Sequence, residues 1–396
     1  MANTLMEQSK VGILVEGTWG TAPAGNAMLL EVASGEWLRD VVEEYRDEMV
    51  RNVLARDFGS VPTVAHGEGT LSGAFTAIMP VYFLDSVLGG TEAKGNLHDT
   101  TANTTVDTLM DIHTFTVGAN PRTMVVQQSD AIVDELYLGM MVNSFTLRFN
   151  SGEGAVEWEA DLIGKGRVFP ATAKTVADNT MVLAANRPPK PLVGAMAAVD
   201  INGVTTAKVL DFEMVISREI EMGYGAGNTR RPNIRRTSAP QITFRATAEL
   251  QLESDVQKFS SDPGVNTNAQ AATVIFDEPN ATFFDGHLDY WHVRIATDPD
   301  VTLALTPLPT TAVADAATAS GTLGDQYVAS TDSNECVIDI YLDRVTYGSD
   351  PIVIDRSEKT ATIVFNGTAL YETTDSRLGV FRVMNRKLTA YTNNDV

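Results

Sequence analysis

The sequence contains one cysteine, five histidines and no long apolar run. Because Cys336 is alone, no disulfide can form within the chain, and its strand-like surroundings at 336–340 are typical of a small core residue. No segment approaches the ~18 apolar residues of a membrane span, and the first residues lack the apolar core of a signal peptide. These absences predict a soluble protein made in a cytosol, with no membrane partner.

Positive charge is also scarce, with 29 Lys and Arg against 51 Asp and Glu and a net charge of −22 at pH 7. Phosphate groups are bound through Lys and Arg, so this balance argues against simple binding of DNA, RNA or an anionic membrane. Only nine of the basic residues are lysine, a composition that is compatible with a salt-rich host environment. A hydrophobic content of 44% is normal for a globular protein, and 396 residues can hold two or three domains.

The residue constellations of enzymes are missing. His287 and His292 lie near Asp285 and Asp289, but their spacing matches no usual metal motif. The glycine-rich stretch 223–227 follows a strand and opens no helix, so a phosphate cradle is not expected. The sequence therefore predicts a protein that is not an enzyme and that holds no metal and no cofactor.

The clearest positive pattern is strict alternation over residues 141–165, which predicts a β-hairpin with one packed and one solvated face. Its turn falls at 151–154. On the return strand, Glu157, Glu159 and Asp161 share the solvated face. Carboxylates aligned on one strand repel one another, so the row needs an explanation.

The first part of the chain reads as an arm followed by strands. Residues 1–27 resemble an extended arm, in which Trp19 packs either on another subunit or back on its own domain. Residues 36–54 fit a helix or a long excursion of strand and loop. A strand at 67–79 then leads into a short helix at 81–88, which begins after Pro80 and ends before Gly89.

The same order of strand, long excursion, strand, helix, two strands and hairpin occurs twice. The sequence predicts a first domain at 28–168, a linker at 169–195 and a second domain at 196–396. The second domain contains an exposed insertion at 297–334, and its hairpin falls at 336–344 and 359–371. Identity between the halves is slight, so the repeat lies in pattern rather than in letters.

The two excursions carry opposite charge, which suits contacts between neighbouring copies or stacked subunits. A merely solvated face, or binding of nucleic acid by the arginines, are the alternatives. The predicted inter-subunit contacts are Trp19, the acidic Glu43, Glu44, Asp47 and Glu48, and the basic Arg230, Arg231, Arg235 and Arg236.

This layout resembles the tail tube proteins of long-tailed bacteriophages and related tailed viruses. The resemblance is carried by the order of weak features at 17–22, 67–73 and 88–90, and by the hairpin strands at 142–147 and 160–164. It covers roughly residues 10–168 and extends to the second half through the repeated pattern. No single motif is diagnostic, and the insertion at 297–334 departs from the compact pattern.

The resemblance implies a mainly β fold with two tandem tail-tube domains of β-sandwich or half-barrel type, each with a short helix. Such domains close into a β-barrel ring by oligomerisation, which removes exposed sheet edges. Family rings usually contain six domains, so three double-domain chains would mimic a hexamer, with a true hexamer as the alternative. Stacked rings form the tube of a virion tail, assembled in the cytoplasm of a bacterial or archaeal host.

The partners that the resemblance implies are further copies of the chain, a tape-measure protein and a tail-terminator or tail-tip protein. Double-stranded DNA would pass through the tube without specific binding. A lumen lined by Glu157, Glu159 and Asp161 would repel DNA and let it slide, whereas an acidic outer wall is the alternative. Two other functions stay open: the inner tube of a contractile injection machine, and a β-sandwich protein that binds a surface or receptor.

Overall fold

The computed structural model describes most of the chain, and the larger share of that part is β-strand. The described residues are 10–33, 38–46, 60–98, 106–129, 133–170, 176–177, 191–201, 204–205, 208–225, 231–249, 289–296, 336–355, 362–371, 378–385 and 390–391.

The first half of the chain consists of strands and one described helix, which lies where the sequence predicted it. In chain order, its elements are β1 (Lys10–Val15), β2 (Ala27–Leu30), β3 (Leu38–Arg46), β4 (Ser60–Ala74), α2 (Val81–Leu88), β5 (Gly89–His98), β6 (Val106–Val117), β7 (Met124–Ser129), β8 (Asp134–Asn150), β9 (Glu153–Gly164), β10 (Gly166–Val168) and β11 (Val176–Ala177).

The second half follows after a short 3-10 helix, η1 (Gly194–Met196). Its strands are β12 (Ala198–Ile201), β13 (Val204–Thr205), β14 (Lys208–Ser217), β15 (Ile220–Gly223), β16 (Ile234–Thr237), β17 (Gln241–Glu249), β18 (Asp289–Ala296), β19 (Val337–Asp355), β20 (Thr362–Ala369) and β21 (Val380–Asn385). The insertion predicted at 297–334 lies outside the described residues.

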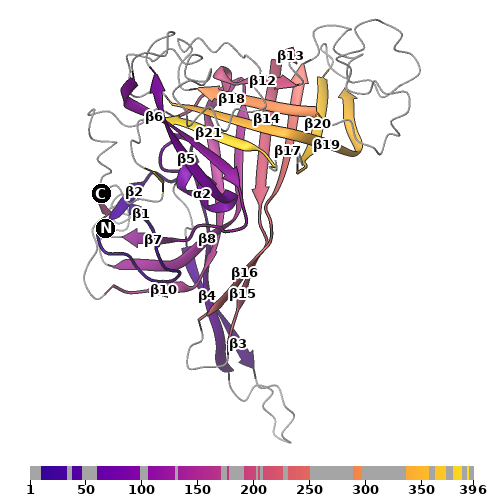
Figure 1. Ribbon diagram of the computed structural model, residues 1–396. Coiled ribbons are helices and arrows are strands. Elements are labelled where there is room, and N and C mark those ends of the chain that lie inside the picture. The colour runs from indigo at the N-terminus through magenta and orange to yellow at the C-terminus, as the bar shows by residue number, and fades with distance from the viewer. Residues whose placement is uncertain are drawn as a thin grey trace, which may run out of the picture.

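One continuous antiparallel sheet runs through both halves of the chain (Figure 1). Its strands follow one another in the order β3, β4, β9, β8, β14, β17, β20 and β19. The halves meet where β8 pairs with β14, from Asp211 opposite Asn150 to Ser217 opposite Ser144. The hairpin predicted at 141–165 is present as β8–β9. The hairpin predicted at 336–344 and 359–371 is displaced, because β20 pairs with residues 345–355 of β19, whereas residues 337–342 pair with β18. Both hairpins belong to the same sheet.

Strands of a second layer cross this sheet at its upper end in Figure 1. There the first part of β19 leaves β20 and pairs with β18 and β21. β21 then pairs with β6 of the first half, and β6 pairs with β5. The end of the chain is thus built into the first half rather than kept within its own.

β1 corrects the predicted N-terminal arm. The sequence predicted an extended segment over residues 1–27, but residues 10–15 form a strand between β2 and β7. The physical reason is the apolar content of this strand, since Val11, Ile13 and Leu14 are all buried. This small sheet continues through β7 into the first part of β8, which also pairs with β10.

Helix α2 is fully buried between the layers, and its bounds match the predicted helix at 81–88. Gly89 ends it in the left-handed conformation (φ 62°), which glycine adopts without a steric penalty. The Phe83 ring stacks on Trp158 of β9, with 5.2 Å between ring centroids. The segment that the sequence left open, 36–54, is strand β3 over its described part.

Arg218 ties this helix to the second half. It is buried at the end of β14, and its guanidinium donates hydrogen bonds to carbonyl oxygens only, among them those of Val87 and Leu88 at the end of α2. Burial lowers the pKa of Arg218 to about 10. The remaining acceptors are the carbonyls of Gly118, Ala119 and Ser238. A cation at the carboxyl end of a helix interacts favourably with the helix dipole.

The hydrophobic core is also shared, because one cluster of buried side chains includes residues of both halves. A chain of aromatic contacts crosses the seam between β8 and β14: Phe149, Phe212, Phe244, Trp291 and Phe365 follow one another with ring centroids 4.5–6.1 Å apart. The division into two homologous domains stays a prediction.

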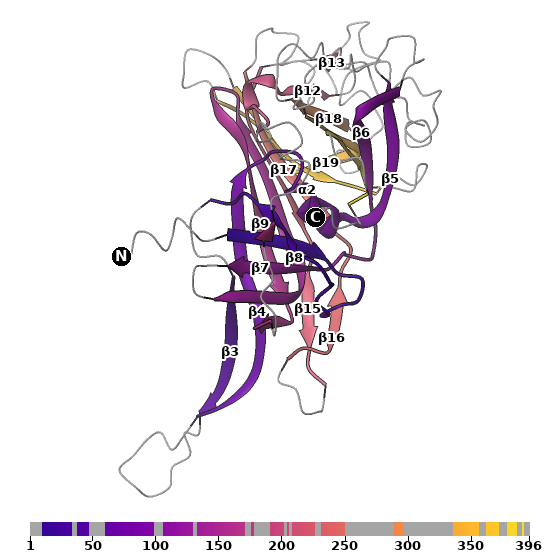
Figure 2. The ribbon, with the colours of Figure 1, turned by 90° about the vertical axis from the view of Figure 1, so that its left-hand side faces the viewer.

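Two long hairpins extend from this body on the same side (Figures 1 and 2). One is β3–β4 of the first half and the other is β15–β16 of the second half. They are the excursions that the sequence predicted at corresponding places in the two halves.

Candidate functional site

The candidate site is the polar face of the continuous sheet, the face opposite α2. On β9 the side chains of Val156, Trp158, Ala160 and Leu162 are buried in the core. The alternate residues Glu157, Glu159 and Asp161 therefore lie together on the polar face, which is turned away from the core, as the sequence predicted from the period of two.

Neighbouring strands compensate this carboxylate row. Arg148 Nε on β8 donates to Glu157 at 2.8 Å, although both side chains are more than half exposed. Asp161 accepts hydrogen bonds from the hydroxyls of Thr70 on β4 (2.6 Å) and Ser144 on β8 (2.7 Å). The repulsion within the row is thus offset on both sides, which the sequence pattern of one strand could not show.

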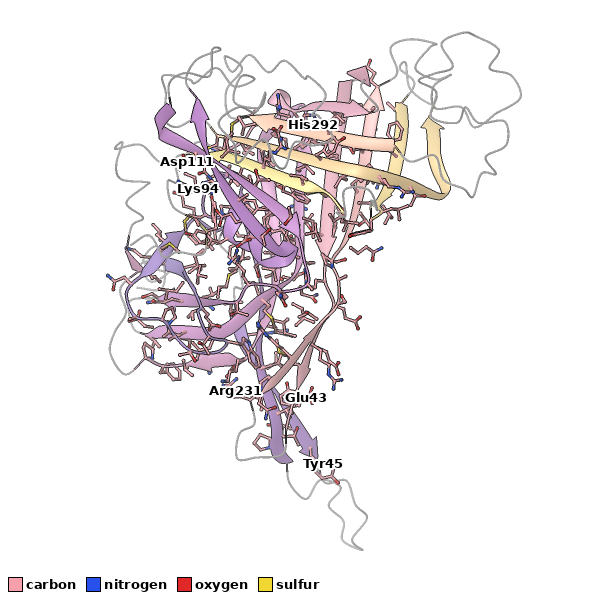
Figure 3. All side chains as sticks on the ribbon, viewed as in Figure 1. Glu43, Tyr45, Lys94, Asp111, Arg231 and His292 are labelled. Carbon is pink, nitrogen blue, oxygen red and sulfur yellow. The ribbon has the colours of Figure 1, made fainter. Side chains whose placement is uncertain are left out.

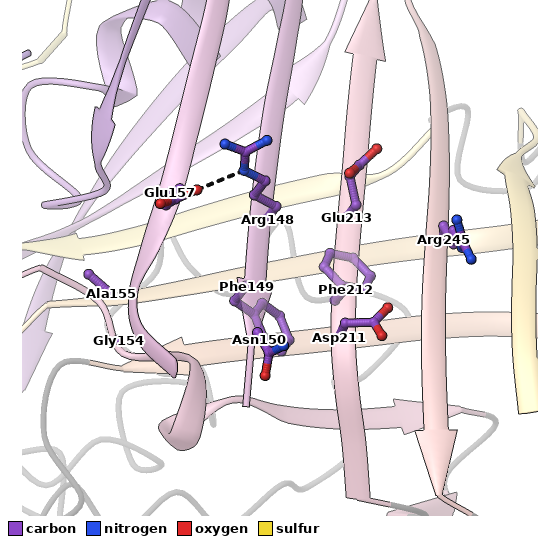
Figure 4. Close-up of a pocket in the computed structure, with 10 residues that line it drawn as sticks. All are labelled: Arg148, Phe149, Asn150, Gly154, Ala155, Glu157, Asp211, Phe212, Glu213 and Arg245. Carbon is purple, nitrogen blue, oxygen red and sulfur yellow. Dashed lines mark hydrogen bonds and ion pairs between the residues drawn. The ribbon is translucent and has the colours of Figure 1, made fainter. Parts of the chain in front are cut away.

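Charge alternates across four neighbouring strands. Strand register places Glu157 opposite Arg148, Arg148 opposite Glu213, and Glu213 opposite Arg245. Figure 4 shows these side chains projecting from the sheet, with the ion pair between Glu157 and Arg148. They line an open cavity of about 590 Å³ together with residues at the ends of the strands, among them Asn150 and Asp211.

The face remains acidic as a whole. Its described side chains over β9, β8, β14 and β17 include six carboxylates: Glu157, Glu159, Asp161, Asp211, Glu213 and Glu249. Against them stand two guanidinium groups, Arg148 and Arg245. The formal balance of 2 − 6 = −4 means that a polyanion close to this face would be repelled.

The two hairpins touch within one chain. Arg231 makes a bidentate ion pair with Asp40 on β3, with its two nitrogens 2.7 and 2.5 Å from the two carboxylate oxygens. Burial would raise the pKa of Asp40, but Arg231 and the backbone N–H of Arg167 outweigh it and lower that pKa. The Tyr224 hydroxyl lies 3.3 Å from His66 Nδ1 in the same region.

The opposite charges of the two excursions predicted a contact of this kind, but the acidic residue that makes it differs from those that the sequence predicted. Asp40 was not among the predicted residues, whereas Glu43 and Glu44 are exposed further along β3. Figure 3 labels Glu43 on this hairpin. Arg236 lies 3.6 Å from Glu221, with both side chains largely exposed. Asp47, Glu48 and Arg230 lie outside the described residues.

Trp19 packs on its own chain. Its Nε1 donates to the carbonyl of Gly139 at 3.2 Å, and Lys165 and Arg235 lie over its ring at 5.7 and 5.6 Å. This is the second of the two arrangements that the sequence left open. Contact of Trp19, or of the hairpin residues, with a neighbouring copy stays a prediction.

The described part of the chain contains no group of three or more His, Cys, Asp or Glu side chains that could hold a metal ion. His292 instead lies buried with its Nε2 3.2 Å from Asp339. None of the described helices is long and apolar enough to cross a membrane.

Comparison with protein families gives one result that decides the class of this chain. The model of a family described as phage tail tube protein matches residues 6–286, which include both sides of the seam between β8 and β14. The chain belongs to the phage tail tube protein family. The mainly β fold and the family expected from the sequence are thereby confirmed.

Membership in the tail tube family makes the protein a structural subunit of a viral tail, located in the virion. It also implies self-assembly into the stacked rings of a tube. No curated protein matches the chain.

Proposed function

We propose that the polar face of the continuous sheet lines the lumen of the tail tube, through which double-stranded DNA is delivered to the host. The observation that carries this proposal is a single sheet with one face packed on the core and the other open, polar and acidic. An open sheet of this kind leaves edges that neighbouring copies can complete, which removes a site of aggregation.

Electrostatics supports a lumen that does not bind its cargo. Free Lys and Arg would bind phosphates and slow passage, whereas carboxylates repel them. Arg148 is engaged by Glu157, so its charge is balanced where it stands. Glu157, Glu159 and Asp161 are the proposed lumen residues.

The chain supplies two hairpins and two halves of the sheet, which fits a ring of three copies with six-fold pseudo-symmetry. Six copies form the alternative ring. Both hairpins extend from one side of the body, so in this proposal they reach the next ring of the stack, with Trp19 and the charged hairpin residues near that contact. A tape-measure protein and a tail-terminator or tail-tip protein complete the tail, which is assembled in the host cytoplasm.

A cryo-EM map of the assembled tube tests the proposal. The side chains of Glu157, Glu159 and Asp161 should project into the channel. A map that places them on the outer surface would overturn it.

Genome delivery gives an independent test. Glu159→Lys should slow DNA ejection from intact particles, because it adds a cation on the proposed lumen wall. Glu159→Gln removes the carboxylate at the same position without adding a cation and is the control. Equal ejection rates for the two variants would contradict the lumen assignment.

A further inference from the structure

The two halves of the sheet repeat the same pairing order. In the first half β4 pairs with β9 and β9 with β8. In the second half β17 pairs with β20 and β20 with β19. In both halves the last two strands form a hairpin, so β4, β9 and β8 correspond to β17, β20 and β19.

The two halves are aligned on the row that pairs a glycine with an aromatic ring, Gly73 with Trp158 in the first half and Gly367 with Phe244 in the second. On the polar face, Ser72, Glu159 and Thr146 stand in one cross-strand row of the first half. The matching row of the second half is Thr243, Thr368 and Thr346. The next row on the core side is Gly73, Trp158 and Leu147 in the first half. Its counterpart in the second half has Phe244 opposite Gly367.

The strand on the other side of each half can be matched in the same way. β14 lies beside β17 with Val215 opposite Thr243. In the first half the backbone N–H of Ala33 donates to the carbonyl of Ser72, the counterpart of Thr243, at 2.7 Å. Residues 31–33 therefore occupy the place of residues 213–215, and Glu31 corresponds to Glu213.

The two strands that pair at the seam inside the chain, β8 and β14, thus have counterparts at the two sides of the row of strands. Inside the chain, β8 pairs with β14, with Thr146 opposite Val215 and Arg148 opposite Glu213. By correspondence, β19 offers the surface of β8, and residues 31–33 offer the surface of β14. In the described row of strands, these two segments lie at opposite sides, and Glu31 and Ala33 are exposed.

We infer that β19 of one copy pairs antiparallel with residues 31–33 of the next copy, with Thr346 opposite Ala33. This inference rests on the proposed ring and names the strands that close it. The ladder between β19 and β20 loses its regular register after Tyr347, so the correspondence with β8 is carried no further along β19 than Thr346.

Cysteine cross-linking tests the register. In a Cys336→Ala background, Ala33→Cys and Thr346→Cys are combined, tubes are assembled and oxidised, and the chains are separated without reductant. We expect covalent species of two and three chains and none larger, because a ring of three copies closes on itself. Each single cysteine variant should remain monomeric on the gel.

The matched control is the pair across the internal seam. Thr146→Cys with Val215→Cys should form a disulfide within one chain, seen by mass spectrometry after proteolysis and without a change in chain number. A ladder that continues to six chains would uphold the strand pairing and overturn the ring of three.

The two levels of the proposal can fail separately. Regular tubes in negative stain without cross-linked species from the Ala33–Thr346 pair would overturn the seam and leave the tube function standing. Where the double variant does not assemble, a cryo-EM map of the unmodified tube decides, because β19 must lie beside residues 31–33 of the next copy. Absence of rings and tubes from the unmodified protein would count against the proposed function itself.

Discussion

The two halves of the sheet solve one packing problem in opposite ways. Register places Gly73 opposite Trp158 in the first half and Phe244 opposite Gly367 in the second half. Each row thus contains one aromatic ring and one glycine, but the strands that supply them are exchanged. A Cβ on Gly367 would lie 2.3 Å from the Phe244 ring, and one on Gly73 would lie 3.3 Å from Trp158 Nε1. In this row the two halves share the summed volume of two facing side chains rather than the identity of each residue. This is why the pattern repeats although the amino acids differ.

Two buried carboxylates, Asp85 in the first half and Asp339 in the second, differ in the direction of their pKa shifts. Burial raises the pKa of Asp85 in α2 to about 7, because Arg122 compensates it only in part and Glu92 adds a like charge. Burial also acts on Asp339 of β19, but Arg294 and His292 outweigh it and hold that pKa well below its usual range. The balance between burial and the partners of each carboxylate decides the direction of the shift.

The largest expected effect comes from the aromatic ring of the first half. Trp158→Ala should lower the free energy of unfolding by about 3–5 kcal/mol, because it removes a fully buried ring stacked on Phe83 and leaves a cavity. Denaturant unfolding of the unassembled protein measures the loss. Trp158→Phe is the control and should retain most of the stability. A loss below about 1 kcal/mol for the alanine variant would mean that the core collapses around the site.

Asp339→Asn should follow, with a loss of about 3 kcal/mol at neutral pH, because Arg294 would remain buried without its carboxylate. A carboxyl with a lowered pKa contributes stability above its unfolded pKa, and this contribution is lost as the pH falls below about 4. The variant should therefore differ from the parent least in acid. Unfolding curves at several pH values measure both effects.

Asp85→Asn is the opposite case and sharpens the contrast. Because its pKa is raised, Asp85 binds a proton more tightly in the folded chain, and stability falls as the pH rises from about 4 through about 7. The asparagine variant should lose this slope. A parent protein whose stability is constant over that range would contradict the assignment.

Exchanging the glycines tests the packing rows more gently. Gly367→Ala should destabilise by about 1–3 kcal/mol, since the new methyl group meets the Phe244 ring. Gly73→Ala should cost less, because its nearest contact is longer. The double variant Gly367→Ala with Phe244→Leu should recover part of the loss. Equal losses for the two single glycine variants would show that the rows do not differ in free volume.

The smallest effect belongs to the polar face. A double-mutant cycle on Arg148 and Glu157 should give a coupling of about 0.2–1 kcal/mol that decreases with salt, because both side chains are exposed. A coupling above 2 kcal/mol would mean that the pair is more strongly desolvated than its exposure indicates.

Much of the fold could be predicted from local pattern. Alternation over 141–165 predicted the hairpin and its acidic face, and Pro80 and Gly89 bounded helix α2. The hydroxyls of Thr70 and Ser144 on Asp161 could not be predicted, because they depend on register between strands distant in sequence.

The same limit applies to the joints between the halves. Residues 10–15 looked like an arm because their short strand is stabilised by β7, more than a hundred residues further along. Arg218 looked like any charged residue at a strand end, and only the fold brings the carbonyls around it. The pairing of Asp40 with Arg231 could not be predicted, because it depends on how the two hairpins meet in the fold.

β8 is a single strand that belongs to two sheets, with Gly139 in the left-handed conformation (φ 64°) where it passes from one to the other. A force along the strand would be shared by both ladders at once, as shear across many hydrogen bonds loaded in parallel. Gly139 is held on both sides where the strand changes direction, since its carbonyl accepts a hydrogen bond from Trp19 Nε1 and its N–H donates to Glu16. A force across the strand would therefore have to break these contacts before the chain could bend there.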